Sequence, residues 1–228
     1  MNRPHNYEQL SSKPLDLAIV TGFGDKGIGE LKADLDKHLQ LNSSRIISGT
    51  PWNKALEDPE TIIANVSKEL DAIPSENVLL IGHSYGALIA LIIACRRRLL
   101  DIFKLVLIDG PLRSDVEVKP AKIAHFLFFK HYRERFRIAQ ECEDALRDLP
   151  SSKILTIGTA KDSIVPPDAK KLLSNELQVR LSTQTSAETY EPIMKGGTNI
   201  LIDMPKMAGH SLTKSKAELY GKIIKNML

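Results

Sequence analysis

A serine flanked by glycines is the feature of this 228-residue chain with the clearest chemical potential. The segment reads Gly82-His83-Ser84-Tyr85-Gly86, with an apolar run at 78–81 before it and another at 87–94 after it. In a Gly-x-Ser-x-Gly pattern between a strand and a helix, the serine sits on a strained turn that exposes its hydroxyl. The context predicts that Ser84 is a nucleophile rather than an incidental residue of a glycine-rich turn.

A serine hydroxyl needs a nearby base to become a nucleophile, and that base is usually a histidine oriented by a carboxylate. Asp162 follows the apolar run 154–157, and His210 follows the apolar run 199–202. We expect His210 to be the base and Asp162 the acid that orients it. Asp109, directly after the apolar run 105–108, stays a competitor for the acid.

The other histidines are weaker candidates for the base. His83 adjoins Ser84 but is expected to point away from it on such a turn. The remaining four lie in the N-terminal tail or on predicted helices, where a solvated or packing role is more common: His5, His38, His125 and His131.

The elements that must position these residues alternate along the chain. Apolar runs predict about six strands, and segments of helical periodicity lie between them. The strands are expected at 15–20, 45–47, 77–81, 105–108, 154–157 and 199–202, and the helices at 28–41, 58–72, 87–99, 168–176 and 213–227. Asp58 directly before Pro59 predicts an N-cap at the start of the second helix. This alternation predicts an α/β fold, a mostly parallel sheet with helices on both faces.

The sequence predicts one domain, 15–228, after a polar tail at 1–14. An aromatic and basic segment at 111–150 interrupts the alternation, and we interpret it as a small helical lid. The polar segment 179–197 leaves open whether it contains another strand.

Composition narrows the classes of function. A net charge of +3, from 31 basic and 28 acidic residues, does not favour a nucleic-acid partner. The longest apolar stretch, 87–95, is too short for a membrane span, and the polar N-terminus does not resemble a signal peptide, so we expect a cytoplasmic protein. Neither cysteine has the spacing of a zinc site, and we expect no cofactor or metal.

The sequence resembles the α/β-hydrolase family, of the lidded serine esterase or thioesterase type, in three places. They are Gly82-His83-Ser84-Tyr85-Gly86, then Lys161-Asp162 with Val165-Pro166, then Gly209-His210-Ser211. The resemblance implies the family's chain order of Ser, Asp and His. It also implies an oxyanion hole formed by the backbone N–H groups of Tyr85 and Phe23, although the family often has His-Gly where this chain has Thr21-Gly22.

The resemblance implies hydrolysis of a small-molecule acyl ester or thioester through an acyl-enzyme on Ser84. In the lid segment, Phe126, Phe129 and Tyr132 are expected to line an acyl pocket, with lysines and arginines facing outward. Those cations suit an acyl carrier protein or coenzyme A as the donor of the acyl group. An amphipathic helix that only packs and stays soluble explains the same pattern.

A rival hypothesis starts from the segment 21–29, whose glycines also resemble the nucleotide loop of NAD(P)-dependent short-chain dehydrogenases. However, no tyrosine has a lysine four residues later, and the run 45–47 ends in Ser48 rather than in an acidic residue that would hold a ribose. A third hypothesis is a binding protein that keeps the hydrolase fold without catalysis.

Overall fold

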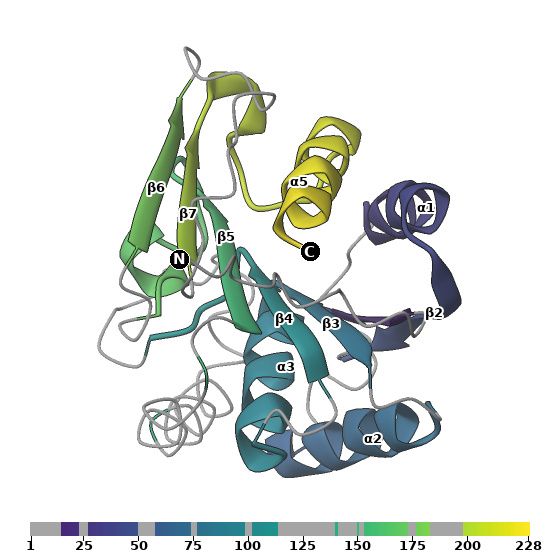
Figure 1. Cartoon of the computed structure of the whole chain (residues 1–228). Helices are drawn as coiled ribbons and strands as arrows, with labels where there is room; N and C mark the ends of the chain where they lie inside the picture. The colour runs from purple at the N-terminus through teal and green to yellow at the C-terminus, as the bar shows by residue number, and fades with distance from the viewer. Residues whose placement is uncertain are drawn as a thin grey trace, which may run out of the picture.

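The computed structural model describes residues 15–22, 27–49, 58–73, 77–98, 102–113, 140, 150, 153–172, 177–182 and 198–228. Its centre is a seven-stranded sheet in the order β2-β1-β3-β4-β5-β7-β6 (Figure 1). The strands are β1 (Leu15–Thr21), β2 (Leu41–Ser48), β3 (Val78–His83), β4 (Ile102–Ile108), β5 (Ile154–Thr159), β6 (Leu177–Ser182) and β7 (Thr198–Asp203). Neighbouring strands pair in parallel, so their carboxyl ends meet at one edge of the sheet.

The six predicted strands correspond to β1 to β5 and β7. The seventh strand, β6, begins at Leu177 and overlaps the segment that the sequence left undecided. It pairs with β7 beyond β5, and so it extends the sheet at the side away from β1.

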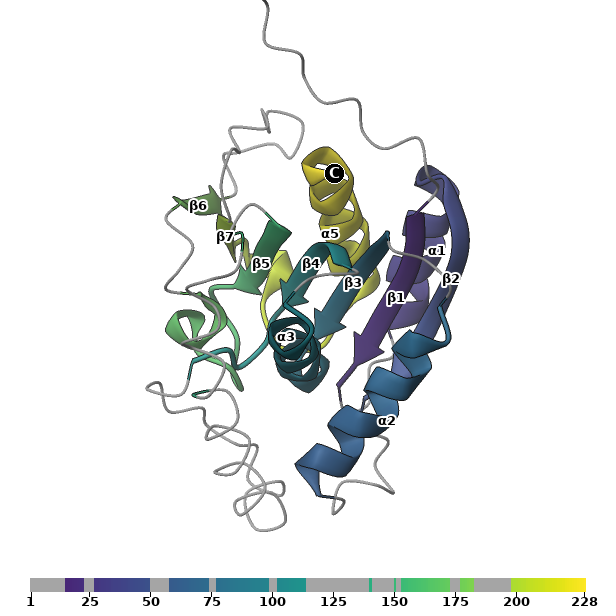
Figure 2. The same cartoon turned by 60° about the horizontal axis from the view of Figure 1, so that its bottom comes forward.

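Among the described elements, two α-helices cover each face of the sheet (Figures 1 and 2). α1 (Ile28–His38) and α5 (Lys214–Met227) lie on one face, and α2 (Pro59–Asp71) and α3 (Tyr85–Arg96) lie on the other. Along β1, Leu17 and Ile19 pack on the side of α1 and α5, whereas Ala18 and Val20 pack on the opposite side. Burial of both faces explains why the strands read as continuous apolar runs.

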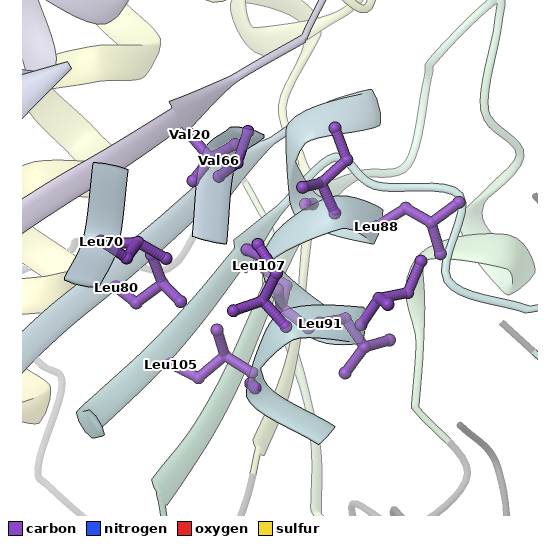
Figure 3. Packing of buried hydrophobic residues seen from close by; sticks show 14 of the residues in the cluster. Val20, Val66, Leu70, Leu80, Leu88, Leu91, Leu105 and Leu107 are labelled. Atoms are coloured by element: carbon purple, nitrogen blue, oxygen red, sulfur yellow. The ribbon is translucent and has the colours of Figure 1, made fainter. Parts of the chain in front are cut away.

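The core under α2 and α3 fixes the helix that follows Ser84. Figure 3 shows residues of this core from β1, β3, β4, α2 and α3. Its labelled side chains are Val20, Val66, Leu70, Leu80, Leu88, Leu91, Leu105 and Leu107. The first eleven residues of α3 are buried, so this helix is held between the sheet and its neighbours.

Local signals placed some helix boundaries correctly and others wrongly. The helix predicted at 28–41 ends at His38, and the helix predicted at 87–99 ends at Arg96. Asp58 caps α2 as predicted, because its carboxylate accepts a hydrogen bond from Thr61 N at 3.2 Å. The helix predicted at 168–176 is wrong: a short 3₁₀ helix, η3 (Pro167–Lys170), ends there, and Lys171 is extended. The Asn199 side chain bonds both N and O of Leu172, which holds the chain in this extended form.

The tail 1–14 and most of the predicted lid lie outside the described residues.

Candidate active site

Ser84 lies between β3 and α3 with a backbone φ of 55°, a value that residues other than glycine rarely adopt. Its N–H donates to the carbonyl of Ile108 in β4 at 2.8 Å, and its carbonyl accepts from Ala87 N at 3.0 Å. These bonds hold the unfavourable backbone conformation in place. The turn therefore has the strained geometry expected of a nucleophile elbow.

The two glycines of the motif allow α3 to approach the sheet closely. A Cβ on Gly82 would lie 2.5 Å from Ala87 Cα, and a Cβ on Gly86 would lie 2.3 Å from Val20 O. Both obstacles are backbone atoms, which cannot turn aside as a flexible side chain can. Glycine is the residue that fits at both positions.

The structure brings Ser84, His210 and Asp162 together from the ends of three strands. Ser84 Oγ lies 2.7 Å from His210 Nε2, and His210 Nδ1 lies 2.9 Å from Asp162 Oδ2. When Nδ1–H donates to Asp162, Nε2 is free to accept the proton of the serine hydroxyl. The arrangement can generate a serine nucleophile.

Asp162 is held as a carboxylate. Its Oδ1 accepts from the backbone N–H groups of Ile164 at 2.8 Å and Val165 at 3.2 Å. Burial by itself raises the pKa of Asp162, but the hydrogen bond from His210 and the positive charge of Lys170 outweigh burial. The pKa of this carboxyl therefore lies well below its usual value.

Asp109, the competitor, has different partners. Its side chain is fully buried; Oδ1 accepts from Thr159 N at 2.9 Å, and Oδ2 accepts from Tyr220 Oη at 2.9 Å. Burial raises the pKa of Asp109, but the positive charges of Lys170 and Lys216 lower it by more than burial raises it. The net pKa is below the usual value, so Asp109 too stays ionised. In the arrangement described here, Asp162 and not Asp109 accepts the hydrogen bond from His210.

Gly209, the residue before His210, has a φ of 89°, and its hydrogen bonds hold the loop that carries His210 in place. Gly209 N donates to Lys161 O at 2.6 Å, and Gly209 O accepts from the ammonium of Lys216. Lys216 comes from α5 and is fully buried, which lowers its pKa, although the charge of Asp109 partly opposes this. Sequence reasoning missed both Lys216 and Lys170, because lysines in such polar stretches are ordinarily solvent-exposed.

The remaining predicted site residues are placed as follows. Tyr85 is the first residue of α3, and a Cβ on Gly22 would lie 3.0 Å from Tyr85 N, so the end of β1 passes close beside the elbow. His83 is fully buried, and its ring stacks 5.9 Å from that of His210, nearer to the site than we expected. Phe23, Phe126, Phe129 and Tyr132 lie outside the described residues.

Two of the glycines that resemble a nucleotide loop, Gly22 and Gly27, have packing roles. A Cβ on Gly22 would lie 2.8 Å from Ser84 Cβ, and a Cβ on Gly27 would lie 1.8 Å from Leu212 O. These contacts account for both glycines without a bound pyrophosphate.

The residues that the structure describes contain neither a candidate metal site nor a helix that could span a membrane. Among them, no group of three or more His, Cys, Asp or Glu side chains is placed to hold a metal ion. Within the same residues, every helix is too short or too polar to cross a membrane.

Solved structures share the fold although their sequences differ. No family model and no curated protein sequence matches the chain. A monoacylglycerol lipase from Paleococcus ferrophilus is 15% identical, with a TM-score of 0.59 and coverage of 93% of this chain and 93% of that one. An esterase domain from Rhodothermus marinus is 16% identical, with a TM-score of 0.57 and coverage of 94% and 87%.

A thioesterase domain from the curacin biosynthetic pathway is 14% identical, with a TM-score of 0.55 and coverage of 94% and 92%. These likenesses extend over almost the whole chain. They show a common fold.

Proposed function

We propose that this chain, which has the α/β-hydrolase fold, is a serine hydrolase that cleaves a carboxylic ester or thioester. The observation that carries the proposal is the continuous hydrogen-bonded chain from Ser84 Oγ through His210 to Asp162, with lengths of 2.7 and 2.9 Å. The lipase, esterase and thioesterase among the structural neighbours support the same class of reaction.

In this mechanism Ser84 Oγ bonds to the acyl carbon while His210 Nε2 takes the hydroxyl proton. The backbone N–H of Tyr85, joined by that of Phe23, donates to the oxygen that becomes negative. His210 then returns the proton to the departing alcohol or thiol as the acyl bond breaks. Water, activated by His210 in the same way, releases the acid from Ser84.

The acyl donor is proposed from the sequence of the lid segment. Its aromatic residues, together with the lysines and arginines between them in the sequence, suit an acyl group linked to coenzyme A or to an acidic carrier protein. A free neutral ester would make no use of those cations.

Turnover of a substrate series tests the proposal. The series contains p-nitrophenyl esters of increasing chain length together with an acyl-coenzyme A thioester. Ser84→Ala should lower turnover at least about a thousandfold on every hydrolysed substrate, because triad members act as a unit. The matched control is Ser48→Ala, an exposed serine at the end of β2, which should keep full turnover. Undiminished turnover in Ser84→Ala would contradict the mechanism.

A further inference from the structure

Lys170 is a buried lysine that the mechanism above does not use. It is 3% exposed, and its ammonium donates to Asp162 Oδ2 and to Asp109 Oδ1, each at 2.6 Å. It also donates to the carbonyl of Thr159 at 3.0 Å. Lysine is almost never fully buried unless it is paired, so this position has a specific role.

The fold provides a slot for this side chain. A Cβ on Gly158 in β5 would lie 2.7 Å from Lys170 Cδ, so the lysine stem lies where a larger residue would stand. Leu112 N donates to Ala169 O at 2.7 Å, which ties η3 to the chain that follows β4. Because this backbone hydrogen bond holds η3 in place, the ammonium of Lys170 lies between the carboxylates of Asp109 and Asp162.

Asp109 anchors the lysine. Besides its bond to Lys170, Asp109 is fixed by Thr159 and by Tyr220, and it has a φ of 48°. Its carboxylate balances the positive charge of the ammonium. Both aspartates follow buried strands, but they have different roles. Asp162 accepts the hydrogen bond from His210, whereas Asp109 holds Lys170.

The bond to Asp162 bears directly on the base. Lys170 and His210 donate to the same oxygen, Asp162 Oδ2, at 2.6 and 2.9 Å. A cation on that oxygen opposes a second positive charge on the imidazole. It also restricts rotation of the carboxylate, whose other oxygen is held by two backbone N–H groups.

We propose that Lys170, anchored by Asp109, is a positioning residue that fixes Asp162 toward His210 and places a positive charge on the oxygen that accepts from His210 Nδ1. This inference rests on the proposed function and adds a residue to it.

Several charged or titratable groups face this site from the packed elements. They are His83 from β3, Asp109 after β4, the Lys161–Asp203 pair beside β5 and β7, Lys170 from η3, and Lys216 and Tyr220 from α5. The test therefore changes the charge at Lys170 and at Asp109 separately and then together.

The measurement is kcat/KM for p-nitrophenyl acetate as a function of pH. In Lys170→Met, the acid limb of the profile should move to higher pH by about one unit, because the opposing cation is gone. In Asp109→Asn it should move to lower pH, because the balancing anion is gone. The double variant should keep the wild-type midpoint, yet its kcat should be lower with KM unchanged, because Asp162 is no longer held.

A matched control is the adjacent Lys171→Met, since Lys171 pairs with the exposed Asp168 at 3.1 Å and not with the site. It should keep both the wild-type acid limb and the wild-type kcat. Urea unfolding of each variant shows which of them are folded.

The outcomes separate this inference from the proposed function. Full turnover in Ser84→Ala would overturn both. Loss of turnover in Ser84→Ala, together with an unmoved acid limb in folded Lys170→Met and Asp109→Asn, would overturn the role of Lys170 alone. If neither single variant folds, the double variant decides, and wild-type kcat in it would overturn the inference.

Discussion

Asp162 and Asp109 follow neighbouring strands, β5 and β4, and both are buried carboxylates of lowered pKa. Asp162 accepts from His210 Nδ1, whereas Asp109 is joined to Asp162 through Lys170. Asp162→Asn should therefore lower kcat by about 10³ to 10⁴, because the amide lets His210 take the wrong tautomer. Asp109→Asn should cost at most about tenfold, since its charge acts at a distance.

We compare kcat of the two variants at pH values where kcat of each no longer changes with pH. A shift of the acid limb then does not lower the measured kcat. A greater loss in Asp109→Asn than in Asp162→Asn would assign the orienting role to Asp109.

At the scale of elements, the carboxyl end of β1 must pass close to the start of α3. A Cβ on Gly22 would lie 2.8 Å from Ser84 Cβ. Gly22→Ala should displace the nucleophile and lower kcat about a hundredfold, because small displacements of reacting groups are costly.

Gly29→Ala is the matched control, since a Cβ there meets nothing within 4 Å and alanine favours α1 more than glycine does. It should keep full turnover and raise the urea midpoint slightly. Equal turnover in the two variants would contradict the packing role of Gly22.

The elements with strong local signals could be predicted from the sequence. Three features depend mainly on residues that are close together in the sequence, so the sequence pattern indicated them. They are the buried strands, the glycines around Ser84 and the Asp58 cap. The helix at 168–176 failed because its backbone is held by Asn199 of β7, a contact that local periodicity does not contain. The chain order Ser, Asp, His indicated that Ser84, Asp162 and His210 meet. It left Asp109 as a competitor for the acid, because Asp109 also lies between Ser84 and His210 in the sequence.

Across the whole molecule, the same dependence on distant contacts explains what the sequence did not indicate. Asp109 joins β4 to β5 through Thr159, to η3 through Lys170 and to α5 through Tyr220. These partners are 50, 61 and 111 residues away along the chain. No local pattern could show that two lysines of polar stretches are buried beside the site.

This cluster predicts how stability depends on pH. The pKa values of Asp109 and Asp162 are lowered by folding, so the unfolded chain binds more protons as the pH falls below about 4. Their contribution to the free energy of unfolding is fully present above that pH and is lost as the pH falls toward the lowered native values.

Urea unfolding between pH 5 and pH 3 measures the effect. Asp109→Asn should be less stable at pH 7 by about 3 kcal/mol, because it breaks a buried ion pair, and its stability should fall less steeply with acid. A slope equal to that of the wild type would contradict the contribution of Asp109.

Stoichiometric labelling by a fluorophosphonate probe, mapped by peptide mass spectrometry, would identify the activated serine. The probe reacts with a serine only where a base activates the hydroxyl, so it reports the Ser84–His210 pair without any assumption about the natural substrate. If Ser84 is the nucleophile and His210 its base, we expect one label per chain, on Ser84, and its loss in His210→Ala while the protein remains folded. Labelling at another residue, or undiminished labelling of Ser84 in His210→Ala, would contradict this assignment.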